Sequence, residues 1–130
     1  MKCTYTVLAL FAGVACVAQA VTEEEVCAQL QARLEKQVEL LSSVQDAASA
    51  KAVLAPLREN MAALAALNGQ VPEDRLWLFI DNSQDIKFSL VEQLQLLSVQ
   101  LNRLTMSDCF GCSELKLIIA PMITIAEDAP

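Results

Sequence analysis

Hydrophobic residues recur at helical spacing over residues 83–106, and the rest of the chain can be organised around this stretch. Apolar positions follow one another at intervals of three or four residues, while Gln, Glu, Ser, Asn and Arg occupy the other sides. The apolar stripe consists of Ile86, Leu90, Leu94, Leu97, Leu101 and Leu104. We therefore predict a long amphipathic helix that packs its stripe against other helices.

Two further stretches have the same period. Residues 22–44 begin with a capping box at Thr22 and Glu25, in which each side chain accepts a bond from the other residue's backbone N–H. Residues 49–67 form the second helix and end at an Asn-Gly pair that is typical of a left-handed helix terminus. Pro56 removes one backbone hydrogen bond and clashes one turn back, so we expect a kink in this helix.

Shorter segments flank the long helix on both sides. Pro72 and two acidic residues open a short helix that contains Trp77 and Phe79, and Ser113 is a candidate cap of a last short helix interrupted by Pro121. We predict an all-α fold, an antiparallel bundle of three long helices with short helices before and after the third. Residues 21–130 form a single domain with a frayed C-terminal tail.

The first twenty residues have the pattern of a signal peptide. Lys2 precedes an apolar run that is too short to span a bilayer, and Ala18-Gln19-Ala20 is an A-x-A site that predicts cleavage after Ala20. Lipidation at Cys16 is an alternative, but Gly13 stands three residues earlier, where a large aliphatic residue is usual. We expect an exported protein, periplasmic or secreted, with no transmembrane segment after signal removal.

Charge and composition exclude several classes of function. The chain has 9 basic and 16 acidic residues, and removing residues 1–20 takes away only Lys2, which leaves a net charge of −8. Such an acidic surface repels nucleic acid and anionic lipid headgroups. There is no histidine, which removes Ser–His and Cys–His catalysis and histidine-ligated metals. We predict no catalytic site, no metal and no cofactor.

Three cysteines remain after signal removal, namely Cys27, Cys109 and Cys112. Thiols of exported proteins tend to be oxidised, so we expect a structural disulfide, either between Cys109 and Cys112 or between Cys27 and one of them. A c-type haem attachment site is excluded, because it requires a histidine directly after the second cysteine and Ser113 stands there. Structural zinc needs four ligands, and a thioredoxin-like redox motif needs a βαβ setting that a helical chain lacks.

Some apolar residues lie away from the main stripe. Phe88 and Val99 are eleven residues apart, which places them nearly in line on the opposite side of the helix. Trp77 and Phe79 belong to the densest patch of large residues and favour a core or lid position. We take these four residues as the candidate interaction surface. We expect the back face with Phe88 and Val99 to be covered by the short Trp77 helix, the C-terminal tail or a second molecule.

Two segments resemble parts of known proteins. Residues 44–52 (VQDAASAKA) with Ala55-Pro56-Leu57, and Phe110-Gly111-Cys112 with Leu115, resemble small, uncharacterised exported helical proteins of bacteria. Those chains often close their long helix with an aromatic-Gly-Ser turn, and this chain has cysteine in place of the serine. The resemblance implies an exported helical architecture and assigns no functional residues.

Three hypotheses for function follow. The leading one is a non-enzymatic exported protein that acts through contacts with an unknown protein or the cell envelope. A small apolar-ligand carrier, with a pocket mouth formed by the Trp77–Phe79 patch and the tail, is the second and requires a cavity of several hundred Å³, on the order of common ligand sites. A thiol-disulfide protein, based on Cys109 and Cys112 alone, is the third.

Overall fold

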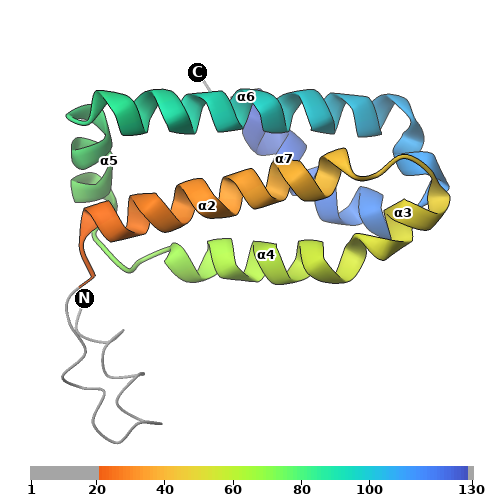
Figure 1. Cartoon of the computed structure of the whole chain (residues 1–130), viewed down its shortest axis with the longest axis horizontal. Helices are drawn as coiled ribbons and strands as arrows, with labels where there is room; N and C mark the ends of the chain where they lie inside the picture. Colours follow the sequence, from red (N-terminus) through yellow and green to blue (C-terminus); the bar gives the residue numbers. More distant parts are fainter. Residues whose placement is uncertain (1–20, 129–130) are drawn as a thin grey trace, which may run out of the picture.

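The computed structural model describes residues 21–128, with side chains to residue 123, and its described secondary structure is helical throughout (Figure 1). The elements in chain order are α2 (Glu23–Ser42), α3 (Ala47–Ala52), α4 (Leu54–Leu67), α5 (Glu73–Asp81), α6 (Gln84–Met106), the 3₁₀ turn η2 (Asp108–Gly111) and α7 (Ser113–Asp128). The predicted signal peptide, its cleavage after Ala20 and the lipidation alternative at Cys16 lie outside the described residues. The all-α fold class is confirmed.

Helix α2 is the centre of the arrangement. It packs against α4 on one side and α6 on the other, and α5 stands across the end where α2 and α6 begin (Figure 1). Helix α7 packs against both α4 and α6. The predicted bundle of three long helices is thus realised only in part, because the second helix is split and the last helix is sixteen residues long.

The split in the second helix follows from its proline. Pro56 lies in the first turn of α4, and its ring cannot coexist with a regular helical carbonyl at residue 52. Helix α3 ends at Ala52, and Val53 joins it to α4 with φ −81° and ψ −15°. The expected kink is therefore present as a break between two helices. The first of them begins at Ala47, where Asp46 and Ser49 form a reciprocal cap, and not at Ser49.

Most of the buried apolar side chains form two separate clusters, and Val26, Leu67 and Val71 are buried outside both. We call the larger cluster the α3-end core. It is built from α3, α4 and η2, from the ends of α2 and α6, and from the start of α7. It contains Leu41, Val44, Ala50, Val53, Leu54, Leu57, Leu101, Leu104, Cys109, Cys112, Leu115 and Ile119. The smaller cluster, the α5-end core, joins the start of α2, α5 and the start of α6, and contains Cys27, Leu34, Ile80 and Leu90. The two ends of the molecule are thus held by cores of very different size.

Polar contacts define how the helices end. The capping box predicted at Thr22 and Glu25 is present, with both reciprocal bonds formed. At the other end of α2, Arg103 of α6 donates to the backbone carbonyls of Val44 at 2.8 Å and Leu41 at 2.9 Å. A cation at a helix C-terminus satisfies carbonyls that have no partner within the helix and complements the helix dipole. Arg103 therefore ties the end of α6 to the end of α2.

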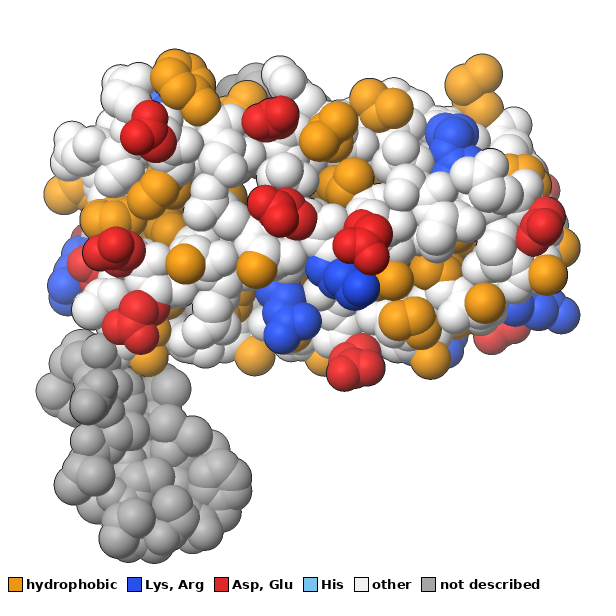
Figure 2. All heavy atoms as spheres, viewed as in Figure 1, with side chains coloured by type: hydrophobic (Ala, Val, Ile, Leu, Met, Phe, Trp, Pro, Cys, Tyr) orange, Lys and Arg blue, Asp and Glu red, His pale blue; other side chains and the backbone are white. Residues whose placement is uncertain are grey.

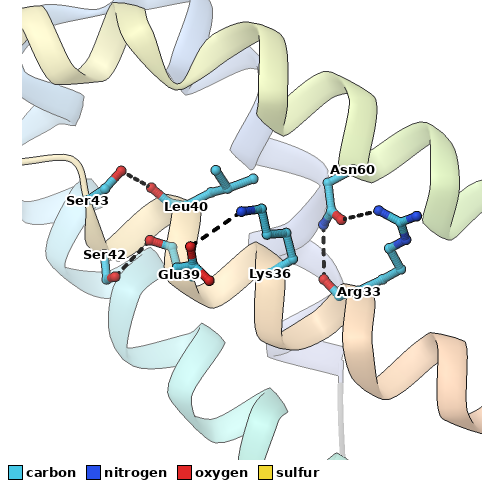
Figure 3. A network of polar contacts seen from close by, with 7 residues as sticks. All are labelled: Arg33, Lys36, Glu39, Leu40, Ser42, Ser43 and Asn60. Atoms are coloured by element: carbon cyan, nitrogen blue, oxygen red, sulfur yellow. Dashed lines mark hydrogen bonds and ion pairs between the residues drawn. The ribbon is translucent and has the colours of Figure 1, made fainter.

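A buried polar pair joins α2 to α4 between the two cores. The Asn60 side-chain amide donates to Gln37 Oε1 at 2.7 Å and to the Arg33 carbonyl at 2.9 Å, and both Asn60 and Gln37 are almost fully buried. Figure 3 shows Asn60 of α4 facing Arg33 of α2. The Gln37 amide in turn donates to the sulfur of Met122 in α7 at 3.4 Å. Buried amides cost free energy unless they are bonded, so this pair sets the register of α2 against α4.

Candidate functional site

The most exposed apolar residues of α6 lie on the face opposite its core stripe. Phe88 is 65% exposed, Val99 59% and Met106 89%. Their separations of eleven and seven residues are close to whole numbers of helical turns, so the three side chains form one line along α6. We call this line the α6 outer row. It confirms that Phe88 and Val99 face outward together, and it extends the predicted pair by Met106.

Apolar exposure continues on both flanks of α6. Val91 and Leu96 are exposed, and Leu94, which the periodicity placed on the buried stripe, is 48% exposed. Leu97 is only half-buried against the α3-end core. The prediction that the whole stripe is buried is therefore wrong at its centre. The reason is that Leu94 lies between the two cores and belongs to neither, so α6 buries a narrower strip there.

Helix α5 contributes further exposed apolar side chains. Trp77 and Leu78 are both more than half exposed. Phe79 is half-buried and packs against the α5-end core, as does Leu76, whereas Ile80 is part of that core. Phe79 is thus a core contact, in agreement with the expected core or lid position, whereas Trp77, for which the same position was expected, is exposed. Trp77, Phe88 and Val99 remain as the exposed members of the candidate interaction surface.

The space-filling view shows the molecule in the orientation of Figure 1, with α6 along one edge (Figure 2). Hydrophobic side chains follow the edge that α6 forms, and acidic side chains lie beside them (Figure 2). Isolated exposed apolar residues are ordinary on a protein surface, but a row of them along one helix is typical of an interaction site.

The basic residues of α6 interact with other groups of this chain, whereas its acidic residues form no ion pair with the described side chains. Its two basic residues contact groups of this chain, because Lys87 pairs with Asp81 at 3.4 Å and Arg103 binds the end of α2. Asp85 and Glu92 are exposed, and neither has an ion pair with the described side chains of residues 21–123. Glu92 lies between Phe88 and Val99 along the helix. The α6 outer row is therefore accompanied by unpaired negative charge.

The predicted disulfide is not present, because Cys27, Cys109 and Cys112 are free thiols. Cys27 lies in the α5-end core, whereas Cys109 and Cys112 lie in the α3-end core. This separation excludes a bond from Cys27 to either of the others in this fold. All three thiols are buried and pack as small apolar groups.

The turn that carries Cys109 and Cys112 has an unusual backbone. Asp108, Cys109 and Phe110 have φ values of 56°, 52° and 54°, and Gly111 follows at 80°. Left-handed backbone costs roughly 1–2 kcal/mol for each residue with a side chain. The turn reverses the chain between α6 and α7 and points both cysteines into the α3-end core. Ser113 is the first residue of α7 and not its cap.

The environment of Cys109 does not favour thiol chemistry. Burial raises the pKa of the Cys109 thiol; nearby Lys116 lowers it in part, and Asp108 and Cys112 add to the increase. Burial also raises the pKa of Cys27, and Glu23 adds to that increase. Redox-active cysteines need an accessible thiolate with a lowered pKa. The structure thus offers no support for the thiol-disulfide hypothesis.

A hollow of about 150 Å³ lies beside the start of α2. It is lined by Val21, Thr22, Glu23, Gln70, Val71, Pro72 and Arg75. The ion pair between Arg75 and Glu23, at 3.2 Å, borders it. Neither Trp77 nor Phe79 lines this hollow, and its volume is below the roughly 300–1,000 Å³ of common ligand sites. It does not favour the ligand-carrier hypothesis.

Two kinds of residue were missed by reasoning from sequence. Gln37 and Asn60 are buried polar residues, and the only signal was their position within an apolar face: Gln37 stands three residues after Leu34, and Asn60 three after Leu57. Met106 was missed because the pattern placed it at the end of the helix. Among the side chains of residues 21–123, no group of three or more Cys, Asp and Glu residues could hold a metal ion together.

Comparisons with protein-family models, with curated proteins and with solved structures give no match to this chain. Among the described helices, none combines the length and hydrophobicity needed to cross a bilayer.

Proposed function

We propose that this chain is an exported, non-enzymatic helical protein that acts by binding another protein or a component of the cell envelope. Its binding surface is the α6 outer row together with Trp77 and Leu78 of α5. The long helices act as an antiparallel bundle that holds this surface rigid.

The single observation that carries the proposal is the exposure of Phe88, Val99 and Met106 in one line. A helix with apolar residues on both its inner and outer faces normally has neighbours on both. Among the described residues, α6 contacts α2, α5, η2 and α7, and these contacts leave Phe88, Val99 and Met106 exposed. Large aromatic side chains such as Phe88 and Trp77 are also the kind of residue that dominates binding energy at protein interfaces.

Photo-crosslinking tests the proposal directly. A photoreactive benzoylphenylalanine replaces Val99, and the protein is expressed and exported in its native host before irradiation. We expect a discrete crosslinked adduct of higher mass, visible on a denaturing gel and identified by mass spectrometry.

The matched control places the same photoreactive residue at Leu117, which is 76% exposed on α7 and lies outside the binding surface. We expect no adduct from that position. An absence of adducts at residue 99, or the same adducts from both positions, would contradict the proposed function.

Export itself has a separate test. Residues 1–20 have the signal-peptide pattern, so the intact mass of the exported protein should correspond to a chain that begins at Val21. A mass that includes acyl chains on Cys16 would contradict this proposal and would place the protein on a membrane surface.

A further inference from the structure

We propose that the α6 outer row binds a basic amphipathic helix of a partner protein; this inference rests on the proposed function and names the chemistry of the partner. The apolar face of the partner helix packs along Phe88, Val99 and Met106. Its Lys and Arg residues pair with the acidic residues beside that row.

The length of the row suits a helix. Phe88 and Met106 are eighteen residues apart on α6, which corresponds to about 27 Å along the helix axis. A helix laid along that distance makes about five turns, and its residues at positions i, i+3, i+4 and i+7 meet the row repeatedly. Helix packing into an apolar surface is an established mode of peptide recognition.

The positive charge of the partner is inferred from which charged residues of this chain already have a partner within it. Ion pairs within this chain engage Lys36, Arg58, Arg75, Lys87 and Lys116. Arg103 binds backbone carbonyls, and Arg33 contacts Asn60. The basic side chains are thus almost all engaged, whereas Asp85 and Glu92 beside the outer row are exposed and unpaired among the described side chains of residues 21–123. A basic partner supplies the missing positive charge.

The same charges argue against a second copy of this chain as the occupant. Each copy has a net charge of −8 after signal removal and brings its own Asp85 and Glu92 to the shared face. Helix α6 offers no free cation to balance them, since both Lys87 and Arg103 are engaged. Like charges across an interface suppress association.

The inference is tested with designed peptides and the purified exported protein. The first peptide has eighteen residues, with Leu at i, i+3, i+4 and i+7 spacing and Lys elsewhere. The second keeps the Leu positions and has Glu in place of Lys, and the third has the composition of the first in an order without an apolar face. Fluorescence anisotropy of each labelled peptide gives its dissociation constant.

We expect the Leu/Lys peptide to bind at least about tenfold more tightly than either other peptide, and its binding to weaken as salt is added. The double variant Phe88→Ser, Val99→Ser should lose about tenfold or more in affinity, because the apolar contacts are gone. Glu92→Gln should reduce the salt dependence. Leu117→Ser is the matched control and should bind as the unmodified protein does, and circular dichroism checks that each variant is folded.

Three results would overturn the inference. The first is equal affinity for the Leu/Lys peptide and for the third peptide, which has the same composition without an apolar face; this would mean that charge alone drives binding. The second is equal affinity for the Leu/Glu peptide, and the third is a dimer in sedimentation equilibrium that Phe88→Ser abolishes. A crosslinked adduct between residue 99 and a different molecule, combined with any of these results, would leave the proposed function standing, whereas the absence of such an adduct would overturn the proposed function itself.

Discussion

The two ends of this molecule differ in how fully the helices are covered. At the α3 end, η2 and the start of α7 close over the ends of α2 and α6, and twelve side chains form one buried cluster. At the α5 end, a nine-residue helix meets α2 and α6, and the cluster contains only four buried side chains. Helix α6 runs through both regions with the same kind of sequence.

This difference suggests that the buried apolar residues of α6 stabilise the fold and that the exposed ones are available for binding. Apolar residues of α6 that meet the α3-end core, such as Leu101 and Leu104, are buried, whereas those that lie between or outside the cores remain exposed. A fully buried leucine contributes to stability through lost water contact and close packing. An exposed one contributes little to stability and is available to a partner.

The largest effect is expected at the α3 end. Leu104 is fully buried, and Leu104→Ala should lower the free energy of unfolding by about 3–5 kcal/mol, because the surrounding core cannot collapse into the space. Leu90→Ala in the α5-end core should cost about 2–3 kcal/mol, since fewer neighbours surround it. Urea unfolding measures both, with the exposed Leu96→Ala as the control. A larger loss of unfolding free energy for Leu90→Ala than for Leu104→Ala would show that the α5-end core is the more stabilising of the two.

The polar pair between the two cores should have the next largest effect. Asn60→Leu leaves Gln37 Oε1 without its donor in a buried site and should cost about 1–3 kcal/mol. The double variant Gln37→Leu, Asn60→Leu removes both polar groups and should recover much of that loss. A double-mutant cycle in urea measures the coupling. Strictly additive losses would show that the two side chains do not act as a pair.

Thiol labelling compares the local stability of the two ends. Cys27 reports on the α5-end core and Cys109 on the α3-end core, and both thiols are buried. In variants that keep one of them and carry alanine at the other native cysteines, Ellman's reagent should label Cys27 about tenfold faster, relative to the unfolded chain, because the smaller core opens more readily. Faster labelling at Cys109 would contradict this ranking.

The cap of α3 should add a pH dependence at the α3 end. The backbone N–H of Ser49 and then its hydroxyl donate to Asp46 and hold the pKa of that carboxyl below its ordinary value of 3.8. A lowered folded-state pKa contributes stability that is fully present above pH 3.8 and is lost as the pH falls through the folded pKa. Asp46→Asn keeps a capping oxygen without the charge.

Thermal unfolding from pH 7 down to below pH 3.8 measures this contribution. The difference in Tm between the native protein and Asp46→Asn should shrink as Asp46 becomes protonated. A difference that stays constant over the whole range would mean that the bonded carboxylate does not contribute.

The smallest effect on stability is expected at the binding surface. Phe88→Ser and Val99→Ser each remove an exposed apolar side chain, so the free energy of unfolding should change by no more than about 0.5 kcal/mol. Urea unfolding measures this change. A loss comparable to that of Leu104→Ala would show that the outer face is covered by part of this chain, and the surface would then be packed core.

Local features of the helices could be predicted well from sequence. The capping box at Thr22, the end of a helix at Asn68 and the disruption by Pro56 each depend on residues within a turn or two of one another. Such short-range hydrogen bonds and steric clashes are encoded by neighbouring residues. The outward position of Phe88 and Val99 was predictable for the same reason, because helical periodicity alone relates them.

Only the tertiary structure decided which apolar residues are covered and which thiols meet. Leu94 has the spacing of a core residue and is exposed. Trp77 was expected with Phe79 in a core or lid position, but Trp77 is exposed and only Phe79 packs against the α5-end core. Cys27 and Cys109 lie in different cores, a separation that no local pattern contains. Periodicity states which face a residue is on, but burial depends on which distant helix lies opposite that face. In this protein α7 and η2 bury the inner face of α6 at one end, at Leu101 and Leu104, whereas the outer row from Phe88 to Met106 is left exposed.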